Sequence, residues 1–378
     1  MKKVLILYAT AGIGHKKAAL AVKKAFDELS IDNTEVKCED ALDYTNRFYK
    51  WFYLKVYLFM ISRMPYAWGF FYYLTDNRFV NIAIAVARRA GNWLNSGKLV
   101  RYIIDTAPDI VISTHFFASE VISDMKTRGQ TAAGLITVIT DYKLHSWWLS
   151  RRCDIYVAGS DYVVEGLLSA GIPEMRVKLL GLPVEPVFSK PVDRARVIRD
   201  AGLDEGAFTV LVIGGGFGVG PIEEIIQSIN CVTKPIQVIA ICGHNKPLTE
   251  SLERSKPSLR HKIKILGFVD NVYEYMEVSD VLISKSGGIT VAESMSKELP
   301  MIIISPIPGQ ETRNSSFLVG HNAAMKIGGV DGLKPLLESI LSDPGKLGRL
   351  RLAIKEIRRP MACYDIARLS VGIIEEKR

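Results

Sequence analysis

A histidine follows the first apolar run of the chain at a spacing suited to ligand binding. Residues 4–9, VLILYA, predict a buried strand, and apolar positions within residues 18–26 recur at helical spacing behind it. Gly12 and Gly14 permit a tight turn and the close approach of a ligand to the backbone. His15 would then lie at the helix N-terminus, beside the carboxyl end of the strand, where open α/β sheets bind ligands. An ordinary strand-to-helix turn with an exposed histidine is the alternative interpretation.

A second stretch combines glycines and hydroxyl groups in the manner of a phosphate site. SKSGGITVAES, residues 284–294, ends an apolar run and begins a predicted helix. Its free N–H groups, small residues and hydroxyls could cradle a pyrophosphate, and the residues concerned are Ser286, Gly287, Gly288, Ile289 and Thr290. Glu293 lies on the first turns of this helix. A carboxylate there could accept both hydroxyls of a ribose, or could simply be favoured by the helix dipole.

A third stretch offers polar groups suited to a sugar. PIPGQETRN, residues 306–314, follows another apolar run. Gln310, Glu311 and Asn314 supply amides and a carboxylate that could bind sugar hydroxyls. The same residues are also compatible with an ordinary polar helix start.

A further glycine turn, IGGGFGVGPIEEII at residues 213–226, is less specific. Gly214 and Gly216 fit the first two positions of a dinucleotide fingerprint, but Val219 occupies the third. The lysine and hydroxyl of a P-loop are also missing. The turn therefore predicts either an anion cradle at a helix N-terminus or a flexible loop.

The elements that would position these loops are strands alternating with helices. Apolar, β-branched runs occur at residues 109–114, 134–140, 153–159, 208–214, 236–243, 280–284 and 301–305, with helical patterns between most of them. Such βα alternation gives a mostly parallel sheet with helices on both faces.

A break in this rhythm predicts the domain organisation. LPVEPVFSKPVD, residues 182–193, contains three prolines and no periodicity, as is typical of an interdomain linker. We therefore predict an α/β protein of two doubly wound, Rossmann-like domains facing a cleft, which agrees with its 378 residues. The expected domains span residues 1–185 and 194–360, and we expect a helix in 361–378 to pack back toward the first.

Composition narrows the function classes. The net charge of +8 suits a polyanionic partner or an anionic membrane surface. The five cysteines form no C-x-x-C pair, which argues against a disulfide framework or a zinc site and indicates a reducing cytosol. The first residues lack the long apolar core of a signal peptide.

An aromatic and basic segment at residues 44–73 is the most unusual part of the chain. It contains 14 of the 34 aromatic residues, four basic residues and no acid. The longest charge-free run, from Met64 to Thr75, has 12 residues, too short for a span of ~20. Aromatic and basic side chains together suit the headgroup level of an anionic bilayer, and the candidates for this contact are Trp51, Phe52, Trp68, Phe70 and Phe71. The alternatives are a helix pair buried within the domain, or base stacking on a nucleic acid, for which no motif is present.

Taken together, these loops resemble the donor-site signature of nucleotide-sugar glycosyltransferases of the GT-B fold. The branch that contains monogalactosyldiacylglycerol synthase and processive diacylglycerol glucosyltransferase is the most similar, and the lipid-linked N-acetylglucosaminyltransferase of peptidoglycan synthesis is a more distant relative. The resemblance is strongest in GGGFGVG, GFVDNVYEYM, SKSGGITVAES and PGQETRN. AGIGHKKAA is similar to the family's Gly-Gly-Gly-His-type loop, with Ala11 and Ile13 in place of glycines. VITDYKLHSWWLSRRCDIYVAGSD resembles its Thr-Asp segment.

The resemblance implies roles for individual residues. In the second domain, the backbone at Phe268 and Val269 would meet the uracil, and Glu293 would hold the ribose. The diphosphate would lie against residues 286–290 and the turn at Gly216. Residues expected to orient the transferred hexose or to line the reacting site are Gln310, Glu311, Asn314, Gly14 and His15. On the acceptor side, the resemblance implies Asp141, His115, His145 and Trp147.

The implied chemistry is glycosyl transfer with inversion. A general base must take the proton of the attacking hydroxyl. Asp141 is the first candidate, with His15 as its partner or as a stabiliser of the sugar, although Asp141 could instead be a helix-capping or strand-end aspartate. N–H groups and the helix dipole at 286–290 could stabilise the leaving diphosphate, and no D-x-D motif occurs in a plausible donor loop. We therefore expect no metal and no cofactor besides the donor.

These features predict a UDP-sugar-dependent hexosyltransferase, peripheral to the cytoplasmic face of the membrane, that forms a glycolipid on a diacylglycerol-like acceptor. Its partners would be a UDP-hexose, that lipid and an anionic membrane surface, without nucleic acid. The identity of the sugar and processivity stay open. A lipid-pyrophosphate-linked N-acetylglucosaminyltransferase and a UDP-N-acetylglucosamine 2-epimerase are the alternatives. The aromatic segment argues against the epimerase, because an isomerase needs no membrane contact. A non-catalytic membrane-binding protein would leave the donor loops without use.

Overall fold

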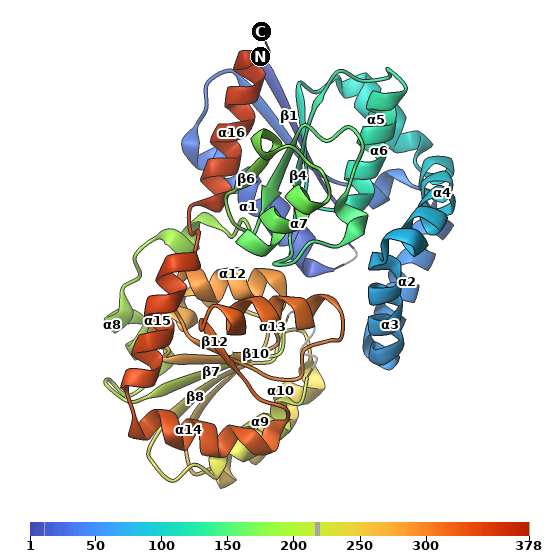
Figure 1. Ribbon diagram of the computed structural model, residues 1–378. Helices are drawn as coiled ribbons and strands as arrows, with labels where there is room; N and C mark the ends of the chain where they lie inside the picture. The colour runs from blue at the N-terminus through green and yellow to red at the C-terminus, as the bar shows by residue number, and fades with distance from the viewer. Residues whose placement is uncertain (11, 216–219, 378) are drawn as a thin grey trace. The chain divides into compact units, whose positions relative to one another are not determined.

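The chain folds into two α/β domains, which a computed structural model describes over residues 1–10, 12–215 and 220–377. The first domain comprises Met1–Pro186 together with Ile307–Arg313 and Arg359–Arg378. The second comprises Val187–Pro306 and Asn314–Arg358. In the described residues each domain contains one six-stranded parallel sheet with helices around it (Figure 1). The prediction of two doubly wound domains is therefore confirmed.

The first sheet has the strand order β2-β1-β3-β4-β5-β6. Its strands are β1 (Lys2–Tyr8), β2 (Thr34–Asp40), β3 (Ile110–Ser113), β4 (Gly134–Val138), β5 (Ile155–Ala158) and β6 (Val177–Leu179). The helices of this domain are α1 (Ile13–Leu29), α2 (Arg47–Arg63), α3 (Pro65–Asp76), α4 (Arg78–Asn95), α5 (Gly97–Thr106), α6 (Phe116–Thr127), α7 (Asp161–Ser169) and α16 (Ala362–Glu376). The order reverses between β1 and β3, which makes their carboxyl ends the expected ligand site.

The second sheet has the order β12-β11-β10-β7-β8-β9 and reverses between β7 and β10. Its strands are β7 (Thr209–Ile213), β8 (Gln237–Ile241), β9 (Lys262–Leu266), β10 (Val281–Ser284), β11 (Met301–Ile303) and β12 (Ala324–Lys326). Its helices are α8 (Arg194–Ala201), α9 (Ile222–Asn230), α10 (Lys246–Ser255), α11 (Val272–Val278), α12 (Gly288–Ser296), α14 (Leu333–Ser342) and α15 (Gly345–Ile357), and α13 (Gln310–Gly320) begins in residues grouped with the first domain.

The predicted strands are the inner ones of each sheet. Every residue of β3, β4, β7, β8 and β10 is buried, because helices cover both faces. The four strands that the sequence patterns did not reveal, β2, β6, β9 and β12, are the four edges. They are short or carry exposed charged residues, as is common for edge strands, and so lack a continuous apolar signal.

The carboxyl-terminal helix completes the first domain. Residues of α16 share a buried core with α1 and the inner strands, including Val22, Ile112, Cys363 and Ile366. Lys2 and Glu375 also form an ion pair. Helix α16 therefore covers one face of the first sheet.

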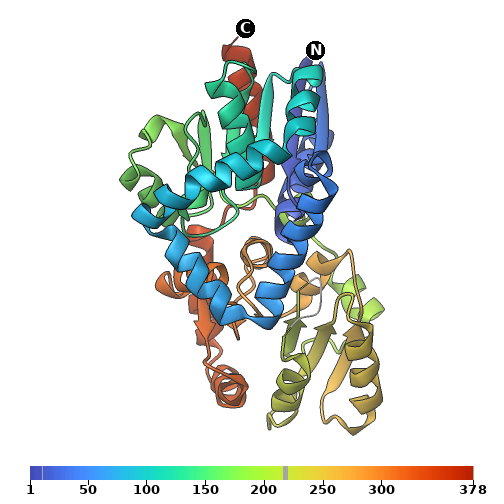
Figure 2. The same cartoon turned by 90° about the vertical axis from the view of Figure 1, so that its right-hand side faces the viewer.

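Three consecutive helices leave the compact part of the first domain. Asn46 caps α2 by accepting a hydrogen bond from the N–H of Phe48, and Pro65 at the first position of α3 ends α2. Figure 2 shows α2 and α3 as a V-shaped pair that projects from the sheet, with α4 leading back to it. This pair contains most of the aromatic segment.

The turn after β5 gives a test of packing in this domain. A Cβ at Gly159 would overlap Leu182 Cδ1 and lie 3.1 Å from the backbone oxygen of Asp141. We expect Gly159→Ala to lower the free energy of unfolding by about 1–3 kcal/mol in urea denaturation. Gly372→Ala in α16 is the matched control, because a Cβ there meets nothing within 4 Å. It should stabilise the protein by about 0.5–1 kcal/mol. Equal stability of Gly159→Ala and the wild type would contradict this packing.

Candidate active site

His15 lies at the point where the first sheet reverses its strand order. It is in the first turn of α1, and Gly14 precedes it within the same helical turn rather than in the expected loop. The Nδ1 atom of His15 is 2.8 Å from the carbonyl oxygen of Thr114, just after β3. The hydroxyl of Thr114 donates back to the carbonyl of His15 at 2.9 Å. These bonds fix the imidazole beside the carboxyl ends of β1 and β3.

The imidazole of His15 is neutral near pH 7. Desolvation lowers its pKa to about 4, although the hydrogen bond to the Thr114 carbonyl opposes this shift. Because Nδ1 faces a carbonyl oxygen, Nδ1 carries the proton and Nε2 has the free lone pair. The ring of His115 lies edge-on at 4.5 Å between centroids. The alternative of an exposed histidine is therefore wrong.

Asp141 is a buried carboxylate with two side-chain donors. Trp148 Nε1 donates to its Oδ2 at 3.3 Å, and Gln310 Nε2 donates to its Oδ1. Desolvation raises the pKa of Asp141 to about 6, while these two bonds and the charge of Arg313 pull in the opposite direction. The residue follows β4 and the buried Thr140. Its carboxyl therefore titrates just below neutral pH, where a general base is most effective.

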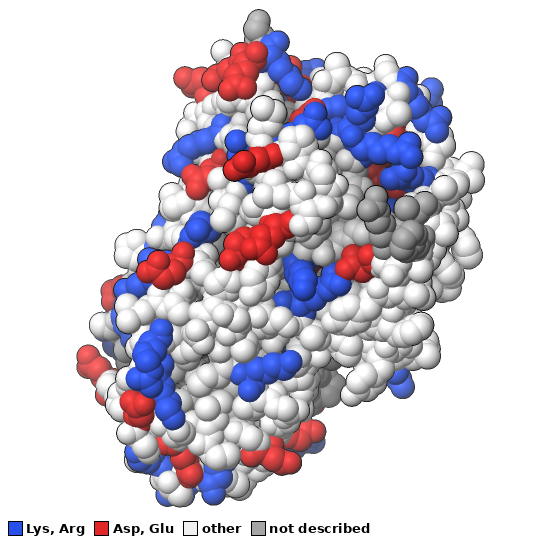
Figure 3. Space-filling model, in the orientation of Figure 1, with Lys and Arg blue, Asp and Glu red and all other residues white. Residues whose placement is uncertain are grey.

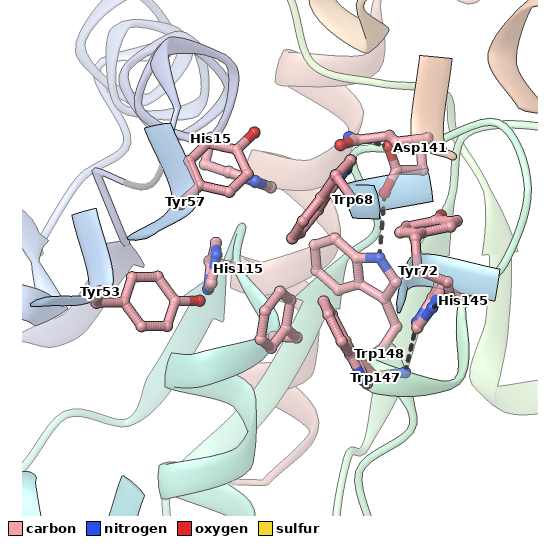
Figure 4. A pocket seen from close by; sticks show the side chains of 12 residues that line it. His15, Tyr53, Tyr57, Trp68, Tyr72, His115, Asp141, His145, Trp147 and Trp148 are labelled. Carbon is pink, nitrogen blue, oxygen red and sulfur yellow. Dashed lines mark hydrogen bonds between the residues drawn. The ribbon is translucent and has the colours of Figure 1, made fainter. Parts of the chain in front are cut away.

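His15 and Asp141 line one pocket of about 70 Å³ (Figure 4). The structure brings the predicted acceptor-side residues His115, His145 and Trp147 to this pocket. It adds Trp68, which was predicted to contact the membrane, and Gln310, from the segment predicted to bind the sugar. The pocket combines a neutral imidazole, a carboxyl group and aromatic walls. Such an arrangement can position a hydroxyl group and accept its proton.

His115 and His145 line the pocket and are N-caps, His115 of helix α6 and His145 of the short turn Ser146–Trp148. Nδ1 of His115 accepts from the N–H of Phe117 at 3.1 Å, and Nδ1 of His145 accepts from the N–H of Trp147 at 3.2 Å. Nε2 of His145 also donates to the carbonyl of Tyr72 at 2.9 Å. Both rings are buried, and desolvation lowers both pKa values, that of His145 to about 4. Both imidazoles are therefore neutral, and their hydrogen bonds hold the backbone of the aromatic residues Phe117 and Trp147.

Sequence reasoning missed several residues of this pocket. Tyr53, Tyr57, Tyr72, Phe116 and Trp148 also line it. The four-residue spacing of Tyr49, Tyr53 and Tyr57 would have placed these tyrosines on one helix face. Arg313 was also missed. It pairs with Asp76, donates to the carbonyl of Leu144 at 3.0 Å and lies over the ring of Tyr72 at 5.0 Å.

The predicted phosphate turn lies after β10 in the second domain. Ser286 and Glu293 are buried, and Gly287 is the N-cap of α12. Because glycine has no side chain to cap the first turn, the N–H groups of residues 288–290 remain suited to an anion. Asn314 is also fully buried, and its Nδ2 donates to the carbonyl of Ser286 at 3.1 Å. Its amide therefore supports the turn.

The other predicted donor residues lie as follows. Phe268 and Val269 come directly after β9, and the exposed ring of Phe268 stacks on His244 with 4.3 Å between centroids. Sequence reasoning missed His244, which follows β8. Glu311 accepts a hydrogen bond from the N–H of Ile307 at 2.7 Å and so braces its own turn. Gly216 lies outside the described residues.

The aromatic helices are largely exposed. None of the described residues of α2 is buried, and the exposed large side chains include Trp51, Phe52, Phe70 and Phe71. Figure 3 shows the side of the first domain that carries α2 and α3 as mainly uncharged. The alternative of a buried helix pair is therefore wrong. No helix in the described part of the chain is long and apolar enough to cross a bilayer.

Comparison with known families shows which proteins the chain resembles. Residues 15–184 match the monogalactosyldiacylglycerol (MGDG) synthase family, and residues 209–338 match the glycosyltransferase family 28 C-terminal domain. Processive diacylglycerol beta-glucosyltransferase of Bacillus licheniformis is 29% identical over 94% of this chain and 91% of that protein. The enzyme of the same name from Bacillus subtilis is 28% identical with the same coverage.

Solved structures share the fold. MurG of Acinetobacter baumannii has a TM-score of 0.64 at 15% identity and covers 98% of this chain and 100% of its own. Anabaena HepE, in complex with UDP and glucose, has a TM-score of 0.57 at 14% identity with the same coverage. The fold is thus GT-B, as the sequence resemblance implied. The chain therefore resembles the glycosyltransferase family of the MGDG synthases and processive diacylglycerol glucosyltransferases.

The environment of Asp141 can be tested directly. Carbon NMR of labelled aspartate should show a carboxyl that titrates near pH 6 and disappears in Asp141→Asn. Trp148→Phe removes a donor to the charged form, so it should raise this pKa by roughly one pH unit. Trp147→Phe is the control, because Trp148 and not Trp147 donates to Asp141, and it should leave the value unchanged. An identical titration in wild type and Trp148→Phe would refute the assigned hydrogen bond.

Proposed function

We propose that the protein transfers a hexose from a UDP-sugar to a diacylglycerol-type lipid at the membrane surface, with inversion at the anomeric carbon. The observation that carries this proposal is the Asp141 carboxyl, buried in an aromatic pocket with a pKa of about 6. The exposed aromatic helices α2 and α3 contribute walls to this pocket. The names of the Bacillus relatives support diacylglycerol as the acceptor and glucose as the first donor sugar to test.

The second domain supplies the donor site in this proposal. The turn at 286–290 takes the diphosphate, Glu293 takes the ribose hydroxyls, and the backbone after β9 takes the uracil. The complexes of Anabaena HepE with UDP and with UDP-glucose, which share the fold, agree with a nucleotide-sugar donor. Negative charge develops on the leaving diphosphate, and the N–H groups and dipole of α12 stabilise it there. The proposal therefore requires no metal ion.

The reaction follows from the protonation states in the pocket. The lipid hydroxyl gives its proton to Asp141 as its oxygen bonds to the anomeric carbon, while the bond from that carbon to the diphosphate oxygen breaks. Asp141 is the better base because its pKa is about 6, whereas that of His15 is about 4. The free Nε2 of His15 accepts a hydrogen bond from a hydroxyl of the reacting sugar. Below pH 6 Asp141 is protonated, so the rate should fall as the pH decreases through that value.

The exposed helix pair α2–α3 supplies the membrane contact in this proposal. Its aromatic side chains insert at the headgroup level, and the exposed Arg47, Lys55 and Arg63 meet anionic lipid headgroups. The donor is cytosolic, so the enzyme works at the cytoplasmic face. Nucleic acid has no part in this function.

Product analysis tests the proposal. Purified protein is incubated with diacylglycerol in anionic vesicles and with UDP-glucose, UDP-galactose or UDP-N-acetylglucosamine, with and without EDTA. A glycosyl-diacylglycerol should form, EDTA should have no effect, and Asp141→Asn should lower the rate by roughly 10²–10⁴-fold. Asp105→Asn, at an exposed position in α5, is the control. Transfer only to a lipid pyrophosphate, or epimerisation of UDP-N-acetylglucosamine, would replace this function with one of the alternatives.

The ribose assignment has a separate test. Glu293→Gln keeps the size of the buried side chain but removes its charge, so it should weaken UDP binding roughly 10-fold in calorimetry. Glu250→Gln, at an exposed position in α10, should bind UDP as the wild type does. Unaltered affinity in Glu293→Gln would overturn the assignment.

The membrane contact is tested by vesicle flotation. Trp51, Phe59 and Phe70 are 56%, 55% and 71% exposed, so their joint replacement by serine should preserve the fold and release the protein from anionic vesicles. Met175 and Leu352 are 76% and 65% exposed and lie outside α2 and α3. Their replacement by serine is the control and should leave vesicle flotation unchanged. If the triple variant floats as the wild type does, helices α2 and α3 are not the membrane contact.

A further inference from the structure

A second cavity of about 400 Å³ lies in the first domain beside the Asp141 pocket. Its walls come from α2, α3, α4 and α6 together with Trp147. Most of the lining side chains are aromatic or aliphatic, among them Phe52, Val56 and Ile84. A cavity with such walls favours an apolar occupant.

The two cavities share walls. Tyr53, Tyr57, Trp68, Phe116 and Trp147 line both of them. Figure 4 shows the rings of Trp68 and Trp148 between His115 and Asp141, with Tyr53 on the far side of His115. A single ligand could therefore place an apolar part in the large cavity and a polar end near Asp141.

Three polar residues of the large cavity, Tyr49, Arg88 and Asn92, form hydrogen bonds within the protein. Arg88 Nη1 and Asn92 Nδ2 donate to the buried Glu120 at 3.0 and 2.7 Å, and the hydroxyl of Tyr49 donates to Asn92 Oδ1 at 2.7 Å. The charge of Arg88 is thus paired with a carboxylate. This end of the cavity is not arranged to receive a charged headgroup.

The cavity also reaches the exposed surface of the helix pair. Phe52 and Phe71 line it and are themselves exposed, 51% and 41% respectively. They connect the cavity to the aromatic surface that we assign to the membrane. These two side chains therefore offer an apolar route from the lipid phase into the cavity.

We propose that this cavity holds one acyl chain of the lipid acceptor, which leaves the glycerol hydroxyl beside Asp141. A methylene group is similar in size to a water molecule, roughly 30 Å³, so the cavity holds on the order of ten methylenes. That capacity fits much of one chain, and the second chain remains in the bilayer. This inference rests on the proposed function, and it assigns the structural basis of acceptor selection.

Gly91 offers a way to fill the cavity without disturbing the fold. It lies in α4 and lines the cavity, and a Cβ there would meet no atom within 4 Å. Gly91→Leu should therefore occupy the space of the acyl chain while the helix remains intact. Gly372→Leu in α16 is the matched control, since a Cβ there also meets no atom within 4 Å and the position lies outside the cavity lining.

The primary readout is binding rather than turnover. The full-length protein is mixed with anionic vesicles that contain a diacylglycerol bearing a diazirine near the end of one acyl chain, then irradiated and digested. Labels should map to α2 and α4 peptides in the wild type and in Gly372→Leu. They should fall roughly 10-fold in Gly91→Leu, because displacing even two methylenes has about that effect on affinity. UDP affinity and thermal melting should not change.

Activity provides the second readout. If the wild type makes glycolipid, Gly91→Leu should lose transfer to long-chain diacylglycerol and keep transfer to water-soluble dibutyrylglycerol. Labels confined to the exposed faces of α2 and α3, at the same level in Gly91→Leu, would overturn the acyl-chain site. Specific labelling of the cavity without glycolipid from any donor would retain the lipid site and reject the proposed reaction.

Discussion

Asp141 has a buried carboxyl, and the hydrogen bonds from Trp148 and Gln310 offset part of the desolvation cost. The balance between these effects decides whether the group is charged at neutral pH. Fewer donors would leave the carboxyl protonated, and more would make it too weak a base. The turns around it, including the caps formed by His115 and His145, serve to hold those donors in place.

The fold supplies this arrangement through the reversal of strand order. Because β1 and β3 are neighbours, His15 and Thr114 meet although 99 residues separate them. Asp141 then follows β4, the next strand across the sheet. The second domain repeats the principle with β7 and β10, where the glycine-rich turn precedes α12. Each candidate site thus lies where parallel strands diverge into helices on opposite faces.

Elements and residues could be predicted from the sequence where an apolar run in the chain is also a buried strand in the fold. The mainly apolar residues 109–114 and 280–284 contain inner strands. Strands β2 and β9 are edge strands with charged residues, so the apolar pattern did not predict them. His15 and Asp141 could be selected because each follows a strand. Trp148, Gln310 and Arg313 could not be paired with Asp141 or Asp76 from sequence, because those contacts depend on how distant loops fold together. The capping roles of His115 and His145 were hidden for the same reason.

The walls of the large cavity have a kinetic consequence. Aromatic and aliphatic side chains meet every methylene of a chain in nearly the same way, so no single depth of insertion is strongly preferred. An acyl chain in such a cavity would move along its length with little resistance. Under the proposed reaction, a lipid that has received a sugar would have its next free hydroxyl farther from the chain, and partial withdrawal of the chain would bring that hydroxyl back to Asp141. The uniform apolar lining of the cavity, rather than a second sugar site in the first domain, would then govern how many sugars are added before the lipid is released.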